Sequence, residues 1–374
     1  MIPLARKTML HEWRRFIPAV MAVGFSGVLL AVQAALVFGI FGSAAVYVSA
    51  SSADLWAGYP GTQSVNFGRG IGADVEMRLR MEPEVTAVEP YVWVDGDWRG
   101  SAGNSGISVY VSGIDTQGTL MFSRILSPAL RKLLREPGAV IVDNSEREQL
   151  NVGSDGNAWI NGQPVHIIAT LDGLRGLGGV NVISSLDTAR MLQGDGTAGA
   201  TYYVAKLKHT ANAATVAKQL QPDVRFGPFA VWTADAFAQR SQLYWLFDTG
   251  AGVAVLFMAV IVLLVGAVIT SQSLLGVIAS SAREYAMLNA LGVSHRSLSR
   301  IVIAQSGWIG GAGLIIATLA SAVLLASAAT YGVPVHMNLT VASICMLLVI
   351  TLALVSGLFA LRGLMRADPT LLLR

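Results

Sequence analysis

Four long apolar segments divide this chain into a membrane part and one large interval of mixed polarity. The interval holds roughly 195 residues, which is enough for one or two folded domains. Each apolar segment is long enough for a transmembrane helix, which takes about 20 residues. The pattern predicts an integral membrane α-helical protein with four transmembrane helices, one before and three after a large exported domain. The four segments are Pro18–Ser49, Leu246–Ser271, Ile301–Thr330 and Val341–Leu361.

Inside the interval, alternating apolar positions predict strands, and helical periods predict short helices between them. Asn161-Gly162 lies between two apolar runs and is typical of a two-residue β-hairpin turn. We therefore expect an α+β extracytoplasmic domain with a small β-rich insertion around Asn151–Asn181. The expected strands are Val85–Trp93, Ile107–Ile114, Ala139–Val142, Val165–Thr170, Asn181–Ile183, Thr201–Leu207 and Val224–Val231, and the expected helices are Arg131–Leu134, Ser145–Leu150, Ser185–Leu192 and Ala211–Leu220.

Helices are expected on both sides of this domain. The first span would be roughly 48 Å long against a hydrocarbon core of about 30 Å, so it should protrude or tilt strongly. Gln33 near its middle is a candidate for a hydrogen bond between helices. Thr233-Ala234-Asp235 is a plausible helix start, and neither Pro nor Gly follows before Gly250. The sequence thus predicts one helix from Thr233 to about Ala279, and the two helices would form a stalk.

The N-terminal segment Leu4–Phe16 places apolar side chains on one helical face and basic ones on the other. This pattern predicts an interfacial helix on the cytoplasmic leaflet, or a charged flank that only sets topology. The apolar run that follows is too long for a cleavable signal peptide and is expected to be a signal anchor.

Charge predicts the orientation in the membrane. Outside Ser51–Trp245 there are ten Lys/Arg against four acids, whereas the exported interval holds sixteen against nineteen. Short loops rich in Lys and Arg stay cytoplasmic. We therefore expect a protein of the bacterial inner membrane with both termini in the cytoplasm and the large domain in the periplasm. The overall charge of +3 reflects this topology and does not indicate nucleic-acid binding.

Composition and missing motifs exclude several functions. The chain is 53% hydrophobic and 13% charged, whereas soluble domains carry about 25% charged residues. It lacks a P-loop, so no ATP binding through that motif is expected. The five histidines are scattered, and the spans contain no pair of charged residues that would mark an ion pathway. We therefore expect a non-catalytic subunit with no catalytic, metal or cofactor site. The single cysteine, Cys345, lies in the fourth span and excludes a disulfide framework.

The segment Arg283–Gly292, between the second and third spans, is predicted to be a short helix outside the membrane. Its apolar residues recur with helical spacing, and Gly292 is a candidate C-cap. A short helix with an exposed apolar face between two spans predicts contact with a soluble partner; the alternative is a solvated connector. The contact residues expected are Arg283, Glu284, Ala286, Met287, Ala290, Leu291 and Gly292.

The third span begins with closely spaced small residues, which let helix backbones approach. They predict either a dimer or moving interface, or ordinary packing within one bundle. The candidates are Gly307, Gly310, Gly311 and Gly313, together with Gln33.

Four regions resemble permeases of the MacB/FtsX class of ABC systems, and most closely the DevC-type subgroup. The loop Glu284–Ser294 is similar to the subgroup pattern E-Y-A-T-L-K-A-M-G-Y-S, with departures at Met287, Asn289, Leu291 and Val293. The other regions are the run Val265-Gly266-x-Val268-Ile269-x-x-Gln272-x-Leu274, the approach Tyr244-Trp245 with Gly250, and the exported Val142-Asp143-x-Ser145.

The resemblance implies a type VII ABC permease-like fold. It implies a homodimer in membrane lipids above two copies of a separate cytoplasmic ATPase, which alone would bind ATP and magnesium. The Arg283–Gly292 helix would be the coupling helix, with Glu284 as the charged contact. ATP-driven movement would pass to the exported domains (mechanotransmission), and a periplasmic membrane-fusion adaptor and an outer-membrane channel would complete an exporter. The alternatives are an FtsX-like signalling subunit that controls a cell-wall hydrolase, and a lipoprotein-releasing permease.

The apolar segments and the resemblance together predict the domain organisation of the chain. It consists of an interfacial helix (1–16), the first span with its stalk (17–49), the periplasmic domain (50–232), a stalk with the second span (233–279), the coupling loop (280–298), the third span (299–330), the fourth span (338–362) and a cytoplasmic tail (363–374).

Overall fold

The computed structural model describes residues 13–101, 106–151, 156–194, 199–221, 228–280, 287 and 295–366. The chain divides into two compact units. We call Met1–Gly39 with Val253–Arg374 the membrane unit, and Ile40–Gly252 the extramembrane unit. The predicted interfacial helix falls mostly on residues 1–12, which lie outside the described residues.

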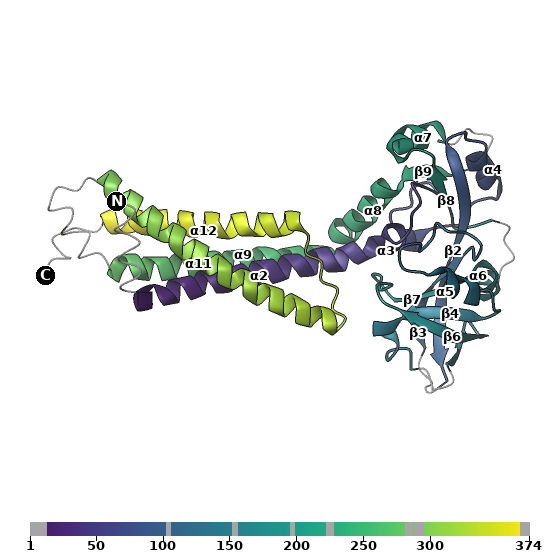
Figure 1. The fold of residues 1–374 in the computed structure, drawn as a ribbon, viewed down its shortest axis with the longest axis horizontal. Helices are drawn as coiled ribbons and strands as arrows, with labels where there is room; N and C mark the ends of the chain where they lie inside the picture. Colours follow the sequence, from purple (N-terminus) through teal and green to yellow (C-terminus); the bar gives the residue numbers. More distant parts are fainter. Residues whose placement is uncertain are drawn as a thin grey trace. The chain divides into compact units, whose positions relative to one another are not determined.

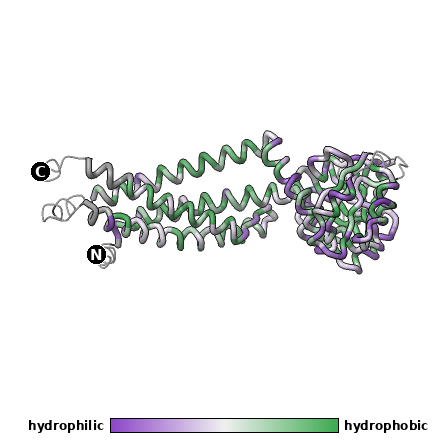
Figure 2. Tube along the Cα trace, turned by 90° about the horizontal axis from the view of Figure 1, so that it is seen from above, coloured by the Kyte–Doolittle hydropathy of each residue, from purple (hydrophilic) through white to green (hydrophobic). Residues whose placement is uncertain are grey.

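Long apolar helices form the membrane unit. They are α2 (Trp13–Gly42), α9 (Gly250–Ser280), α11 (His295–Thr330) and α12 (Leu339–Arg366) (Figure 1). Figure 2 shows that hydrophobic residues dominate all of them. Within the described residues, four helices are long and apolar enough to cross a membrane, which confirms the predicted four-helix class. Helix α2 includes Pro18, where the expected first span starts, and already contains the five residues before it. A proline this near the helix N-terminus removes only one early backbone hydrogen bond.

A mixed sheet forms the extramembrane unit. Its order is β3-β7-β4-β6-β5-β2-β8-β1-β9, and β3 also pairs with β2. Six strands therefore close into a ring, and β8, β1 and β9 extend from β2 outside it. The strands are β1 (Leu55–Gly58), β2 (Val85–Gly100), β3 (Ile107–Ile114), β4 (Ala139–Asp143), β5 (Asn157–Ile160), β6 (Gln163–Leu171), β7 (Val180–Ser185), β8 (Tyr202–Leu207) and β9 (Ala230–Thr233).

The long strand β2 connects the two parts of this sheet. Its first half pairs with β8 from Val85 to Tyr91, and its second half pairs with β3 from Tyr91 to Trp98. Parallel pairs join β3 to β7 and β4 to β6, which requires crossover connections, so the domain is of the α+β type that the sequence predicts.

Short helices connect the strands. Ser127, Ser185 and Thr233 each accept a hydrogen bond from the amide three residues later, as N-cap residues do. The helices are α3 (Val46–Ser49), α4 (Asp74–Arg80), α5 (Pro128–Leu133), α6 (Leu186–Gln193), α7 (Ala213–Gln219) and α8 (Ala234–Leu243). Shorter 3-10 segments are η1 (Ser43–Ala45), η2 (Val65–Phe67), η3 (Asn144–Glu146) and η4 (Thr210–Asn212).

The predicted hairpin is confirmed. Asn161 and Gly162 have φ of 51° and 79° between β5 and β6, as a two-residue turn of this kind requires. The expected separate insertion is wrong, because β5 also pairs with β2 and both strands belong to the main sheet. The expected α-helix Ser145–Leu150 is also wrong, because the structure has only the 3-10 segment η3 in this region. The carboxylates of Asp143 and Glu146 accept hydrogen bonds from the backbone amides of Ser145 and Asn181.

The predicted continuous helix from Thr233 to Ala279 is wrong as well. Helix α8 ends at Leu243, a π-helical turn (η6, Tyr244–Asp248) follows, and Thr249 is extended with φ −98° and ψ 141°. The Thr249 hydroxyl accepts a hydrogen bond from the Gly252 amide at 3.2 Å, so it caps a new helix, α9. A threonine can continue a helix or start one, and apolar periodicity does not distinguish the two.

The hairpin gives a test of the fold. Gly162→Ala adds a Cβ that meets no atom within 4 Å but must adopt a positive φ. We expect a loss of about 1 kcal/mol in the stability of the extramembrane unit, measured on the full chain in detergent by thermal unfolding. Gly70→Ala is the control, because Gly70 also has open space but no positive φ. Equal losses for the two variants would contradict the turn assignment.

Candidate functional site

The predicted coupling residues lie almost entirely outside the described residues. Arg283, Glu284, Ala286, Ala290, Leu291 and Gly292 fall in residues 281–286 and 288–294. Met287 is described; it is helical and its side chain is 50% exposed. What the structure does show is how the end of α9 at Ser280 is held; helix α11 begins at His295 on the other side of this segment.

Helices α2 and α9 are joined by polar contacts at two places. At the end nearest residues 281–294, Arg15 Nε donates to Ser280 Oγ at 2.7 Å. Farther along α9, Thr270 Oγ1 donates to Ser26 Oγ at 3.2 Å, and the one proton of Ser26 Oγ is shared between the Ala22 carbonyl of its own helix at 2.9 Å and the Gly266 carbonyl at 3.1 Å. Hydrogen bonds between helices in a membrane contribute about 0.6 to 2 kcal/mol each, so they select one register of α9 against α2.

An apolar cluster lies between these two polar contacts. Leu274 and Val277 of α9 pack with residues of α2, α11 and α12 and are almost fully buried. The bundle-facing positions Gly266, Thr270, Leu274 and Val277 follow helical spacing along α9. Gly266 and Leu274 both belong to the run on which the family resemblance rests, so that run marks the contact of α9 with α2. The rest of the cluster is Phe16, Ala19, Val23, Ile309, Val349 and Ala353.

The glycines of α11 divide into two pairs. A Cβ on Gly313 would lie 2.7 Å from Val23 Cβ, and one on Gly310 would lie 3.1 Å from Ala353 Cβ. These two glycines pack against α2 and α12 within one bundle. A Cβ on Gly307 or Gly311 would meet no atom within 4 Å, so this pair, four residues apart, is open.

Helix α2 carries contact residues that the sequence analysis did not single out. A Cβ on Gly24 would lie 3.1 Å from Ile316, and one on Gly27 would lie 2.7 Å from Ala317. The run Gly24-Phe25-Ser26-Gly27, with small residues at three of four positions, is the signal that could have found them. Gln33 is half-buried on α2 and forms no hydrogen bond within the described part of the chain.

A second cluster lies in the extramembrane unit, where α3 meets the sheet. Tyr47 of α3 donates its hydroxyl proton to Asn181 Oδ1 at the start of β7. Asn181 in turn donates from its backbone amide to Glu146 Oε2 at 3.3 Å, and from Nδ2 to the Leu174 carbonyl at 2.7 Å. Tyr47 also packs edge-on against Trp93 of β2, with ring centroids 4.9 Å apart. These contacts bind α3 to β7 and β2.

Glu146 is the titratable centre of this cluster. Its side chain is almost fully buried, and burial raises its pKa to about 7, with a further contribution from the neighbouring Asp143 carboxylate. The Asn181 amide and the Arg175 guanidinium oppose this shift. Asp143 accepts hydrogen bonds from Ser145 and from the Leu174 amide at 2.7 Å, so it holds the segment that covers Glu146.

Both clusters join helices to neighbouring elements. Among the described residues, no group of three or more His, Cys, Asp or Glu is placed to hold a metal ion. The contacts can hold the end of α9 at Ser280 against α2 and bind α3 to the sheet.

Comparison with known proteins supports a permease. Residues 256–369 match the family described as "FtsX-like permease C-terminal". No curated protein sequence matches the chain. Among solved structures, the periplasmic region of MacB from Actinobacillus actinomycetemcomitans is similar with 15% identity and a TM-score of 0.37, covering 51% of this chain and 94% of that one. The extracellular domain of the noncanonical ABC-type transporter YknZ from Gram-positive bacteria has 13% identity and a TM-score of 0.34, covering 48% and 100%.

The contact of α9 with α2 can be tested at Gly266. Gly266→Leu would press against Ser26, whose Cβ lies 3.3 Å from the position of a Cβ on residue 266. We expect this substitution to separate the helices and to lower stability by about 1–3 kcal/mol, measured as thermal unfolding in detergent. Gly276→Leu on the same helix meets no atom within 4 Å and should change stability little. If Gly266→Leu and Gly276→Leu change the unfolding temperature equally, α9 does not pack on α2 through Gly266.

The Glu146 cluster predicts a pH dependence. Because the folded state holds the Glu146 proton more tightly than the unfolded chain does, the contribution of Glu146 to stability is greatest below pH 4.5 and is lost as the pH rises through about 7. Glu146→Gln keeps the acceptor for Asn181 and removes the charge. We expect it to stabilise the protein by about 1–2 kcal/mol at pH 8 and to have little effect at pH 5. Thermal unfolding at the two pH values measures this, with the exposed Glu148→Gln as control. A gain of equal size at both pH values would contradict a buried, titrating Glu146.

Proposed function

We propose that the chain is a permease of the MacB/FtsX class, as its sequence resemblance predicted, and that it is the membrane subunit of an ABC exporter. In this proposal a separate cytoplasmic ATPase binds and hydrolyses ATP, and the chain itself is non-catalytic. The chain converts ATPase movement into movement of its exported domain. The DevC-type assignment stays a prediction.

The observation that carries the proposal is the anchored end of α9 next to residues 281–294. Ser280 at the end of α9 is bonded to Arg15 of α2, and Leu274 and Val277 are buried among all four described helices. A partner that pushes on residues 281–294 would therefore move α9 and α2 together instead of bending a loose loop. This is the property that a coupling helix needs, and it supports the roles of Glu284, Ala290 and the other predicted contacts.

Two segments connect the membrane unit with the extramembrane unit. In one of them helix α2 is followed by η1 and α3, and Ala45 at the junction of these two has φ −105° and ψ 11°, outside the helical region. In the other the helices are interrupted at Thr249. We propose that α2 transmits the displacement and that Thr249 is the hinge. The Tyr47–Asn181 contact would then pass the movement of α3 into the sheet.

The spans favour mechanical coupling over a route for substrate through the membrane. The four candidate spans are strongly apolar and hold no pair of opposite charges. We propose that substrate is taken from the periplasm or outer leaflet and is passed on by a periplasmic adaptor and an outer-membrane channel. Both termini would lie in the cytoplasm, and the protein would lie in a bacterial inner membrane.

A homodimer completes the proposal. Helix α9 buries only a narrow stripe of its surface, and Gly307 and Gly311 of α11 are open. Phe257, Leu264 and Val268 leave large apolar side chains exposed on α9. A second copy would cover part of these surfaces, and membrane lipid the remainder.

A pull-down from native membranes in gentle detergent tests the assembly. Recovery of an ATPase with a periplasmic adaptor supports the exporter. Recovery of an ATPase with an activator of a cell-wall hydrolase would replace it with a signalling function. Absence of any ATPase, under conditions that keep a homodimer together, would overturn the coupling role.

Single substitutions test the predicted coupling helix. Glu284→Ala removes the charged contact and Ala290→Trp crowds the apolar face, so we expect each to lower ATP turnover of the complex at least tenfold with unchanged membrane insertion. Asn289→Ala, off the apolar face, should have little effect. Loss of insertion in the first two variants would show that the segment is structural.

A further inference from the structure

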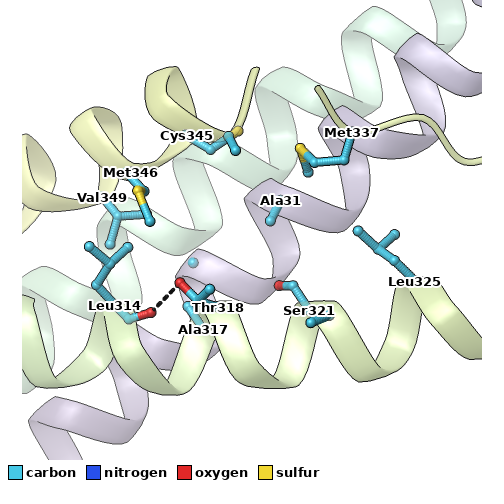
Figure 3. A pocket seen from close by; sticks show the side chains of 13 residues that line it. Ala31, Leu314, Ala317, Thr318, Ser321, Leu325, Met337, Cys345, Met346 and Val349 are labelled. Atoms are coloured by element: carbon cyan, nitrogen blue, oxygen red, sulfur yellow. Dashed lines mark hydrogen bonds between the residues drawn. The ribbon is translucent and has the colours of Figure 1, made fainter. Parts of the chain in front are cut away.

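The membrane unit contains an apolar cavity between α2, α11 and α12. Its volume is about 190 Å³, and it is half open to its surroundings. Gly27 and Ala31 of α2, residues of α11, and Met337 and Cys345 form its walls (Figure 3). Because the walls are nearly all hydrocarbon, water would find few polar partners inside.

One polar atom in this cavity has no partner. Ser321 is 5% exposed, and its hydroxyl forms no hydrogen bond within the described part of the chain. Other hydroxyls on the same helix bond to their own backbone: Thr318 donates to the Leu314 carbonyl at 2.9 Å, and Ser327 donates to the Leu324 carbonyl at 2.8 Å. Figure 3 shows Ser321 in the wall of the cavity and Thr318 bonded to Leu314.

A buried hydroxyl without a partner is unfavourable by about 1–3 kcal/mol. The usual remedy in a membrane helix is a bond to the carbonyl four residues earlier, which here is that of Ala317. Ser321 lines the cavity and does not form this bond, and its oxygen is itself buried. Rotation of this side chain toward the cavity would let an oxygen acceptor on a bound molecule satisfy it.

The shape of the cavity selects the molecule. Wall residues on α11 extend from Leu314 to Leu325, which is about 16 Å of helix. A volume of about 190 Å³ spread over that length is narrow, so it suits a linear hydrocarbon chain better than a compact ring system. The longer part of the cavity runs from Ser321 toward Leu314, and the shorter part runs toward Leu325, Met337 and the end of α11.

We propose that this cavity binds one linear acyl chain whose carboxyl or ester oxygen accepts a hydrogen bond from Ser321. The chain extends toward Leu314 and Val349, and the carboxyl carbon or headgroup leaves past Leu325 and Met337. The same chemistry is present in a free fatty acid and in a phospholipid. This site is separate from the coupling segment, and acyl-chain binding does not depend on the proposed export function.

Photo-cross-linking to the purified full-length protein tests the site without any ATPase. The probe is palmitic acid with a diazirine midway along its chain, used in a steroid-based detergent that has no linear alkyl chain. We expect cross-links in the segments 314–325 and 342–349, and excess plain palmitic acid should lower their yield. If phosphatidylcholine also lowers the cross-linking yield, esterified chains bind as well. If only palmitic acid lowers it, the free acid is the ligand.

Two substitutions separate the cavity from general lipid contact. Ser321→Ala removes only the hydroxyl, and we expect about fivefold weaker binding of the probe, as for the loss of one neutral hydrogen bond. Ala31→Phe fills the cavity and should abolish cross-linking in both segments. Ser327→Ala and Ala34→Phe are the matched controls, because neither residue lines the cavity.

Three results would overturn the proposal. The first is a cross-linking pattern spread evenly over exposed positions such as Leu264 and Val268 of α9. The second is cross-linking that plain palmitic acid does not lower. The third is equal binding by the wild type, Ser321→Ala and Ala31→Phe. Because all these readouts are binding measurements, their failure would leave the coupling proposal unaffected.

Discussion

Apolar side chains gain little by leaving lipid for another apolar helix, so helices in a bilayer associate through close packing and hydrogen bonds. The membrane unit of this protein depends on that constraint. Helix α2 supplies both kinds of contact, with Gly24 and Gly27 against α11 and Ser26 against α9. Larger residues at those positions would separate the helices and remove the contacts that hold α9 near residues 281–294.

The extramembrane unit follows the opposite rule, because water surrounds it and burial of apolar surface stabilises it. Its sheet closes through β2, and two apolar clusters lie on either side. Buried polar groups then need partners, and Tyr47, Asn181 and Glu146 provide them for one another. The same hydrogen bonds bind α3, which continues from the first membrane helix, to the sheet.

These two packing regimes are the physical basis of the proposed mechanical coupling. In that proposal the spans keep a register against one another through few specific contacts, and the exported domain would respond through the buried network around α3. A partner acting on residues 281–294 would move structures that are already joined. The cavity beside Ser321 lies in the same bundle, so an acyl chain bound there would fill space between α2, α11 and α12.

Much of this organisation could be predicted from the sequence, because the signals are local. Apolar length predicted the four spans, and Asn161-Gly162 predicted the hairpin, since each property belongs to adjacent residues. Small residues on the third span predicted close packing, although not which glycines face which partner: Gly310 and Gly313 turn inward, and Gly307 and Gly311 stay open.

Other features depended on residues far apart in the chain. The interruption at Thr249 could not be read from apolar periodicity, because a hydroxyl can either cap a helix or continue one. The pairing of β5 with β2 placed a presumed insertion in the main sheet. The raised pKa of Glu146 and the unpartnered hydroxyl of Ser321 likewise arise from their surroundings, which only the tertiary structure brings together. The sequence by itself determined the class of protein and its spans, and the tertiary structure decided which side chains meet, because contacts between distant segments are not encoded in local patterns.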